Sequence, residues 1–295
     1  MQRTSIRDDL RSYWEVTKPK IWYLLVFTAL ISTFISERVN NVSVSIIMYL
    51  LVFGSVTAGS AAANTLTSYI DRDIDAIMER TKHRPIPSGR IKPNNALYYG
   101  LSLTCIALIL AWLINVYAFA LMIFGLFDNI IVYSKWLKRR SASNIILGGF
   151  SGGAPALIGY VAASIQNIEL GLILAGLVFL WTPTHIWSLA MRVKDDYARA
   201  KVPMLPVVMK EDIAIRIISI ATLIMVVFSI LPVFWGYFNI IYLVTSIVLG
   251  VIISVMSIVL VIKPTPNRSW QLFKFSSPYL TIIFIFMAID AAIHM

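Results

Sequence analysis

Residues 43–89, SVSIIMYLLVFGSVTAGSAAANTLTSYIDRDIDAIMERTKHRPIPSG, join a long uncharged run to a dense cluster of charges. A helix needs about 20 apolar residues to cross the hydrocarbon core of a bilayer. Residues 43–70 carry no charge and therefore predict a membrane-spanning helix. Three aspartates at alternate positions follow at once, which predicts that chemistry is placed where this helix leaves the membrane.

The rest of the chain repeats the apolar pattern. Of 295 residues, 58% are hydrophobic and only 14% are charged, which is too few to give a soluble domain its polar surface. We predict an all-α, polytopic membrane protein: one domain over residues 1–295, a single bundle with its active-site loops in the cytoplasm. Residues 1–20 are polar and are expected to form a cytoplasmic segment rather than a cleavable signal peptide. The nine predicted spans are 21–36, 43–70, 95–114, 116–135, 144–164, 168–190, 213–236, 239–262 and 272–293.

The basic residues predict the orientation in the cell membrane. Of the 25 lysines and arginines, 24 fall before the first span, in the loops of one side or in the span ends next to those loops, and only Arg38 falls on the other side. Positive charge marks cytoplasmic loops, so the N-terminus is predicted inside and the C-terminus outside. The net charge of +10 therefore reports topology, and nucleic acid is not an expected partner. Cys105 is the only cysteine, which excludes a disulfide framework and a cysteine-based zinc site.

The charged cluster predicts a metal site. On a helix, Asn64, Thr67, Asp71 and Asp75 share one face, while Asp73 points away from it. Two carboxylates one turn apart repel each other unless a cation lies between them. Carboxylate and amide oxygens suit Mg²⁺, which completes its shell with water and phosphate oxygens. The neighbouring cations Arg80, Lys82 and Arg84 then predict a bound diphosphate.

These residues carry a family resemblance. Asn64, Asp71 and Asp75, followed by Arg80, Thr81, Arg84 and Pro85, resemble the signature of the UbiA-type intramembrane prenyltransferases. The string YIDRDIDAIMERTKHRPIPSGRI (69–91) is similar to one branch, the protohaem IX farnesyltransferases or haem O synthases. Residues 133–160 and 181–208 support it, and the matching motifs span roughly 15 to 210. The chain departs from the branch at Thr67 and at His83, where asparagine is common.

The resemblance implies a second acidic group in the loop over residues 192–212, which echoes the first loop as a weak internal repeat. Asp195 and Asp196 are adjacent and cannot face one metal equally, so Asp196 is preferred and Asp195 comes second. Further cations could neutralise the leaving diphosphate or bind lipid headgroups. These are Lys138, Arg192, Lys194 and Arg199. The expected metal ligands are Asn64, Asp71, Asp75 and Asp196, and the expected catalytic residues are these four with Asp195.

His185 is the candidate residue for haem, as an axial ligand or a propionate contact, although packing in the helix is the commoner role of such a histidine. The resemblance implies transfer of a farnesyl group from farnesyl diphosphate to the vinyl group of haem B, followed by water addition, giving haem O and diphosphate. Haem A synthase or a haem–copper oxidase would then receive the product.

Two alternatives stay open. A related prenyltransferase could act on an aromatic or lipid acceptor, since the diphosphate motif is shared. A transporter would need charged residues inside its helices. Here such charges are nearly confined to Asp128 and Asp290, which disfavours transport. Asp128 itself could pair with a neighbour or take part in catalysis.

Overall fold

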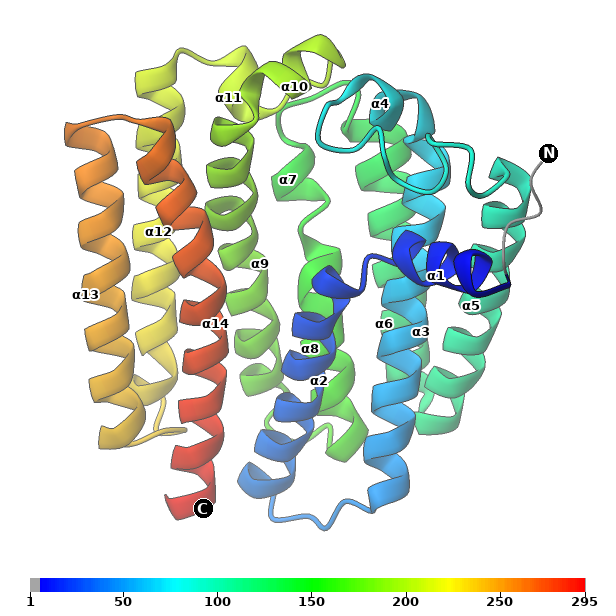
Figure 1. Ribbon diagram of the computed structural model, residues 1–295. Helices are drawn as coiled ribbons and strands as arrows, with labels where there is room; N and C mark the ends of the chain where they lie inside the picture. The colour runs from blue at the N-terminus through cyan, green and yellow to red at the C-terminus, as the bar shows by residue number, and fades with distance from the viewer. Residues whose placement is uncertain (1–5, 295) are drawn as a thin grey trace.

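The computed structural model describes residues 6–294, and every regular element in that range is a helix (Figure 1). Arg3, one of the basic residues counted before the first span, lies outside the described residues. In chain order the elements are α1 (Ile6–Val16), α2 (Pro19–Val39), α3 (Ile46–Ile70), α4 (Arg72–Ile77), α5 (Pro93–Ile114), α6 (Val116–Phe127), η1 (Asp128–Leu137), α7 (Asn144–Leu147), α8 (Phe150–Ala163), α9 (Ile168–Arg192), α10 (Lys194–Arg199), α11 (Leu205–Val208), α12 (Glu211–Phe234), α13 (Ile240–Ile262) and α14 (Pro266–His294).

Nine segments of the described chain are long and apolar enough to cross a membrane, which confirms the predicted number of spans. Their ends lie within three residues of the predicted ends, except that α14 begins at Pro266 rather than at residue 272. The fourth span is α6 continued by η1, and the fifth is α7 continued by α8. The polar segment before the first span contains the helix α1, which the hydropathy pattern did not predict.

The fourth span changes its helical winding halfway. From Asp128 to Leu137 the chain forms the π-helix η1, and its last turn is closed by the N–H of Lys138 donating to the carbonyl of Tyr133 at 2.8 Å. This wider winding changes the direction in which each side chain points relative to an α-helix, and π-turns are frequent at functional sites. Here it sets the position of Lys138, which lies in the site described below.

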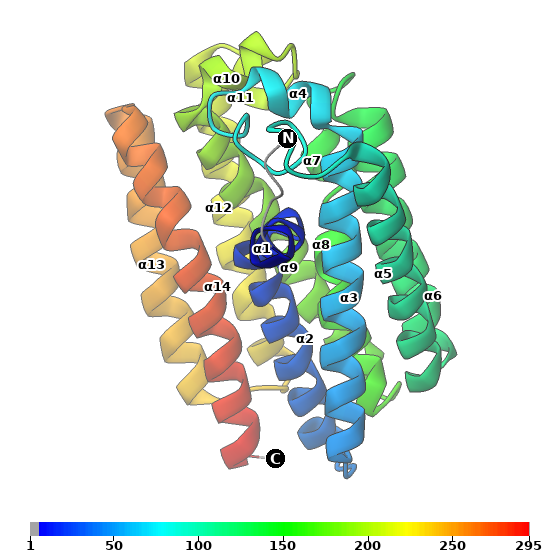
Figure 2. The ribbon, with the colours of Figure 1, turned by 45° about the vertical axis from the view of Figure 1, so that its right-hand side comes forward.

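Two groups of helices form the bundle. One apolar core lies between α2, α3, α5, α6 and α8, and a second between α9, α12, α13 and α14 (Figures 1 and 2). Small residues allow α2 and α8 to approach closely: a Cβ placed on Gly159 would lie 1.9 Å from the carbonyl oxygen of Ala29. Thr33 also donates to the carbonyl of Gly159 at 2.9 Å. Such close contacts between small residues are the usual means of helix association in lipid.

Two carboxylates inside the bundle cap the first turns of neighbouring helices. Asp128 accepts the backbone N–H of Ser151 in the first turn of α8 at 2.8 Å. Asp290 accepts the N–H groups of Asn239 and Tyr242 at the start of α13, at 2.9 and 3.0 Å. The first N–H groups of a helix have no partner within it, and the helix dipole favours negative charge there. Both interior charges thus have a structural role, which weakens the transporter alternative further.

The connections α4, α10 and α11 gather at one end of the bundle, at the top of Figure 1. We call this end the loop face. Helix α1 does not run parallel to the spans but crosses in front of α3, and in Figure 2 it is viewed almost along its axis. The chain then turns at Thr17 and Lys18 into α2.

Candidate active site at the loop face

The site begins where α3 ends. Asp71 terminates α3 and precedes α4, and its N–H donates to the carbonyl of Thr67 at 2.9 Å. The N–H of Asp75 donates in turn to the carbonyl of Asp71 at 2.8 Å. The helical spacing therefore continues through the junction, and Asp71 and Asp75 lie one turn apart. Both side chains are buried, whereas Asp73 between them is exposed.

Each buried carboxylate has a cation of its own. Asp71 is paired with Lys138, which follows η1. Asp75 accepts both of its hydrogen bonds from Nη1 of Arg84, at 2.9 Å to each oxygen. Burial alone would lower the pKa of Lys138, but the charge of Asp71 prevails and raises this pKa above its usual range. Each of the two carboxylates therefore has one basic side chain as its direct partner.

One oxygen of this cluster has no partner. Oδ1 of Asp71 is buried and accepts no hydrogen bond, although Oδ2 of the same carboxylate is paired with Lys138. A buried carboxylate oxygen without a partner costs free energy unless a cation or water satisfies it. Within residues 6–294, no three His, Cys, Asp or Glu side chains come together as a metal cluster. The two buried carboxylates, Asp71 and Asp75, suit an ion such as Mg²⁺, which takes one or two carboxylates and completes its shell with water and phosphate oxygens.

The second loop is joined to the first through Asp196. Its buried carboxylate accepts the backbone N–H groups of Glu79 and Arg80, at 3.3 and 3.1 Å, and is also paired with Arg199. Asp195 beside it is exposed. In both loops a span ends and a helix of six residues follows, α4 after α3 and α10 after α9, as the internal repeat predicted. Both oxygens of Asp196 are occupied by these contacts, which fix the first loop against the second.

The other cations predicted for the diphosphate differ in their contacts and in their exposure. Lys82 forms an exposed ion pair with Glu79. Arg80 meets Asp196 through its backbone N–H. Arg192 is exposed at the end of α9, and Lys194 is half-buried at the start of α10. Of the seven cations predicted for the diphosphate, the structure therefore brings Arg84 and Lys138 directly to Asp75 and Asp71.

Lys18 belongs to the same cluster and was not predicted from the sequence. It lies in the left-handed region, with φ 54°, directly before Pro19 begins α2. Burial, and then the nearby charge of Arg84, lower the pKa of Lys18 to about 7, although Asp75 and Asp71 act in the opposite direction. The position of this lysine in the sequence, before a proline that opens an apolar span, was the one available signal.

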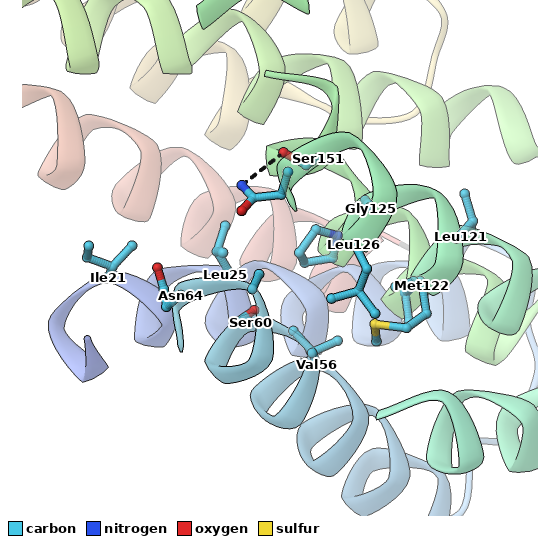
Figure 3. A pocket seen from close by; sticks show the side chains of 16 residues that line it. Ile21, Leu25, Val56, Ser60, Asn64, Leu121, Met122, Gly125, Leu126 and Ser151 are labelled. Carbon is cyan, nitrogen blue, oxygen red and sulfur yellow. Dashed lines mark hydrogen bonds between the residues drawn. The ribbon is translucent and has the colours of Figure 1, made fainter. Parts of the chain in front are cut away.

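An apolar cavity lies below the carboxylates (Figure 3). Counting its open side, it encloses about 590 Å³ between α2, α3, α6 with η1, and α8. Ile21 and Asn64 lie at one end in Figure 3, and Leu121 and Met122 at the other. From Asn64 to Val56 the cavity follows α3 for about 12 Å, at 1.5 Å per residue. Its polar lining is Ser60, Asn64, Asn129 and Ser151.

Asn64 lies farther down the same helical face. Seven residues separate it from Asp71, or about 10.5 Å along α3. Its side chain lines the cavity. The role of Asn64 as a metal ligand stays a prediction. Thr67, one turn below Asp71, is the nearer side-chain oxygen, and it donates to the carbonyl of Asn64 at 3.1 Å.

His185 lies between α9 and α14. Its ring stacks on Trp181 at 4.3 Å between centroids and is tilted against Phe273 at 4.3 Å. Its Nδ1 atom is 2.8 Å from the hydroxyl of Ser276. Two aromatic rings thus pack against the imidazole, and these contacts agree with the packing role. The haem role of His185 stays a prediction.

The chain has close relatives of known name. Residues 25–285 match the UbiA prenyltransferase family. The chain is 44% identical over 309 residues to the protoheme IX farnesyltransferase 2 of Cenarchaeum symbiosum, with all of both chains covered. Among solved structures, a digeranylgeranylglyceryl phosphate synthase is similar with a TM-score of 0.80, at 23% identity over 96% of this chain and 98% of that one. A UbiA homologue from Archaeoglobus fulgidus, bound to GPP and Mg²⁺, gives a TM-score of 0.60 at 15% identity, over 94% of this chain and 99% of that one.

Proposed function

The chain belongs to the UbiA prenyltransferase family, and from that membership we propose that it transfers a farnesyl group from farnesyl diphosphate to the vinyl group of haem B. Water addition completes the reaction, which gives haem O and diphosphate. The proposal rests on the position of two features relative to each other. A buried pair of carboxylates with their own cations lies at the loop face, and an apolar cavity lies below it. A prenyl diphosphate has the same two parts, a charged head and an apolar tail.

Two buried carboxylates, Asp71 and Asp75, would hold Mg²⁺, and the unpartnered oxygen of Asp71 is the first donor available to it. The ion would supply positive charge to stabilise the leaving diphosphate. Arg84, Lys138 and Lys18 surround the same carboxylates and would bind the diphosphate oxygens. Charges that are already in position stabilise the developing anion without reorganisation. Asp196 supports this arrangement by holding the backbone of the first loop.

The cavity is proposed to hold the farnesyl chain. Its lining is mostly aliphatic, and it lies within the spans, so the allylic cation formed as the diphosphate leaves would be shielded from bulk water. Haem B would approach from the membrane, where its flat apolar ring is soluble. Haem A synthase or a haem–copper oxidase would be the next protein to receive the product.

The acceptor is assigned from the named relative. The lipid synthase resembles this chain in fold at 23% identity, whereas the haem-modifying relative is 44% identical over both whole chains. The second comparison favours haem over an aromatic or lipid acceptor. The protein is a multi-pass membrane protein, and we propose that its loop face is cytoplasmic and its C-terminus outside, because positive charge concentrates in the loops of that face.

A direct product assay tests the proposal. Membranes that hold the protein would be incubated with Mg²⁺, haem B and farnesyl diphosphate, and the extracted haem would be weighed by mass spectrometry. We expect the mass of haem B increased by one farnesyl group and one hydroxyl group, because the added water releases a proton. If the haem is unmodified and an added aromatic or glycerol-phosphate acceptor is prenylated instead, the haem proposal is contradicted and the alternative function is supported.

The substitution Lys18→Met tests the contribution of the unpredicted lysine. We expect the KM for farnesyl diphosphate to rise about tenfold, because a lost hydrogen bond to a charged group costs about 1.5–3 kcal/mol. Lys20→Met is the matched control, since Lys20 is exposed two residues further along the same chain segment. Equal KM values in the two variants would remove Lys18 from the site.

A further inference from the structure

Helix α1 carries an apolar stripe that the protein does not cover. Ile6, Leu10 and Trp14 follow one another at intervals of four residues and so share one face. They are 80%, 67% and 57% exposed. The ring of Trp14 meets the ring of Trp22 edge to face, at 5.7 Å between centroids. An exposed apolar stripe on a helix with a polar opposite face is typical of a helix that lies in a membrane interface.

The position of α1 agrees with such an interface. Helix α2 has 21 residues and is therefore about 31 Å long, which matches the hydrocarbon core of a bilayer at about 30 Å. Helix α1 joins the end of α2 that lies toward the loop face, and in Figure 1 it lies below α4, beside the upper half of α3. It runs across α3 rather than along it (Figures 1 and 2), so its axis lies in the membrane plane.

The other end of α1 is attached to the active-site loop. Glu15 forms two hydrogen bonds with Arg90, at 2.6 and 3.0 Å, and Arg90 also donates to the carbonyl of His83 at 2.7 Å. Arg90 lowers the pKa of Glu15 through these contacts. Val16 belongs to a small apolar core with Ile86, beside the ring pair of Tyr13 and Tyr99. These contacts connect α1 to residues 78–92, which include Arg84.

We propose that α1 inserts Ile6, Leu10 and Trp14 into the bilayer boundary on the loop-face side, and that this insertion holds residues 78–92 in position. The bilayer is the occupant because α1 leads directly into the membrane span α2, on which Tyr23 is 54% exposed. Helix α1 has two basic and three acidic residues, so burial of apolar area, and not attraction to anionic lipid, drives the insertion. The arrangement gives the membrane a direct influence on the loop that carries Arg84.

Nitroxide labelling tests the insertion. In a Cys105→Ser background, single cysteines would replace Leu10 and, on the opposite side of α1, Asp8. In nanodiscs of phosphatidylcholine, we expect the label at position 10 to collide with oxygen and to be shielded from a water-soluble nickel complex. The label at position 8 should show the reverse. Equal nickel access at both positions would overturn the proposal, as would shielding from both reagents, which means a second protein copy. Insertion seen only with anionic lipid would overturn the apolar driving force.

Trypsin tests the coupling to the loop, because Arg80, Lys82 and Arg90 are cleavable sites within it. Leu10→Glu should increase cleavage in residues 78–92 several-fold, and Leu10→Met, which keeps the apolar area, should leave it unchanged. Glu15→Gln should also increase cleavage while the label at position 10 stays in lipid. If Leu10→Glu removes the helix from the bilayer and cleavage does not change, the insertion does not hold the loop.

Discussion

Asp75→Asn is expected to reduce farnesyl transfer by about 10³-fold or more, with the protein still inserted in the membrane. The change removes one of two buried charges that would hold the metal, and loss of a single group that stabilises developing charge costs about 10²–10³-fold on its own. It also leaves Arg84 facing a neutral amide at 2.9 Å, so this cation no longer has its counter-charge. Product formation measured at saturating Mg²⁺ gives the effect.

The neighbouring aspartate is the matched control. Asp73→Asn makes the same chemical change two residues away, but Asp73 is exposed and its pair with Arg139 is a surface ion pair. Such pairs contribute about 0–1 kcal/mol, so activity and stability should stay close to those of the unaltered protein. Full activity of Asp75→Asn, or an equal loss in both variants, would contradict the assignment of the site.

Gly159→Ala is expected to have the largest effect on stability. The added Cβ would lie 1.9 Å from the carbonyl oxygen of Ala29 and 2.6 Å from its carbonyl carbon. These are backbone atoms of α2 and cannot rotate away, so α2 and α8 must separate. Overpacking of this kind costs about 3 kcal/mol or more. Thermal unfolding in detergent, followed by loss of helical signal or by aggregation, measures the loss.

Gly54→Ala is the control for this prediction. Its Cβ would meet one methyl group of Leu110 at 3.2 Å, which a small rotation of that side chain relieves. Alanine also has the higher helix propensity, by about 1 kcal/mol, so Gly54→Ala should be neutral or slightly stabilising. If Gly159→Ala unfolds at the same temperature as Gly54→Ala, the stability of the protein does not depend on the close contact between α2 and α8.

The nine spans could be predicted because hydropathy and length alone decide them. What hydropathy could not show was the local winding: residues 116–137 together have the hydropathy of an ordinary span, and the π-helix within them is defined only by its hydrogen bonding. Helix α1 was missed for a related reason. Charged residues lie between Ile6, Leu10 and Trp14. The hydropathy averaged over the length of a membrane span is therefore low, and the segment is classed as polar.

The site was predicted in part. Helical spacing correctly predicted that Asp71 and Asp75 lie together and that Asp73 points elsewhere. This prediction was possible because it depends only on residues that are near in sequence. The same spacing places Asn64 on the shared face, about 10.5 Å farther along α3, where it lines the cavity. Lys18 and Lys138 come from distant segments, and no local pattern shows that a fold will bring them to the same carboxylates.

The paired charges at the loop face have a consequence for how substrates arrive. Two carboxylates and their two cations already sum to zero in the resting protein. A divalent ion that came by itself would leave this enclosed space strongly positive, and a diphosphate by itself would leave it negative. If Mg²⁺ and the diphosphate bind here as proposed, electroneutrality would favour their joint arrival as one complex.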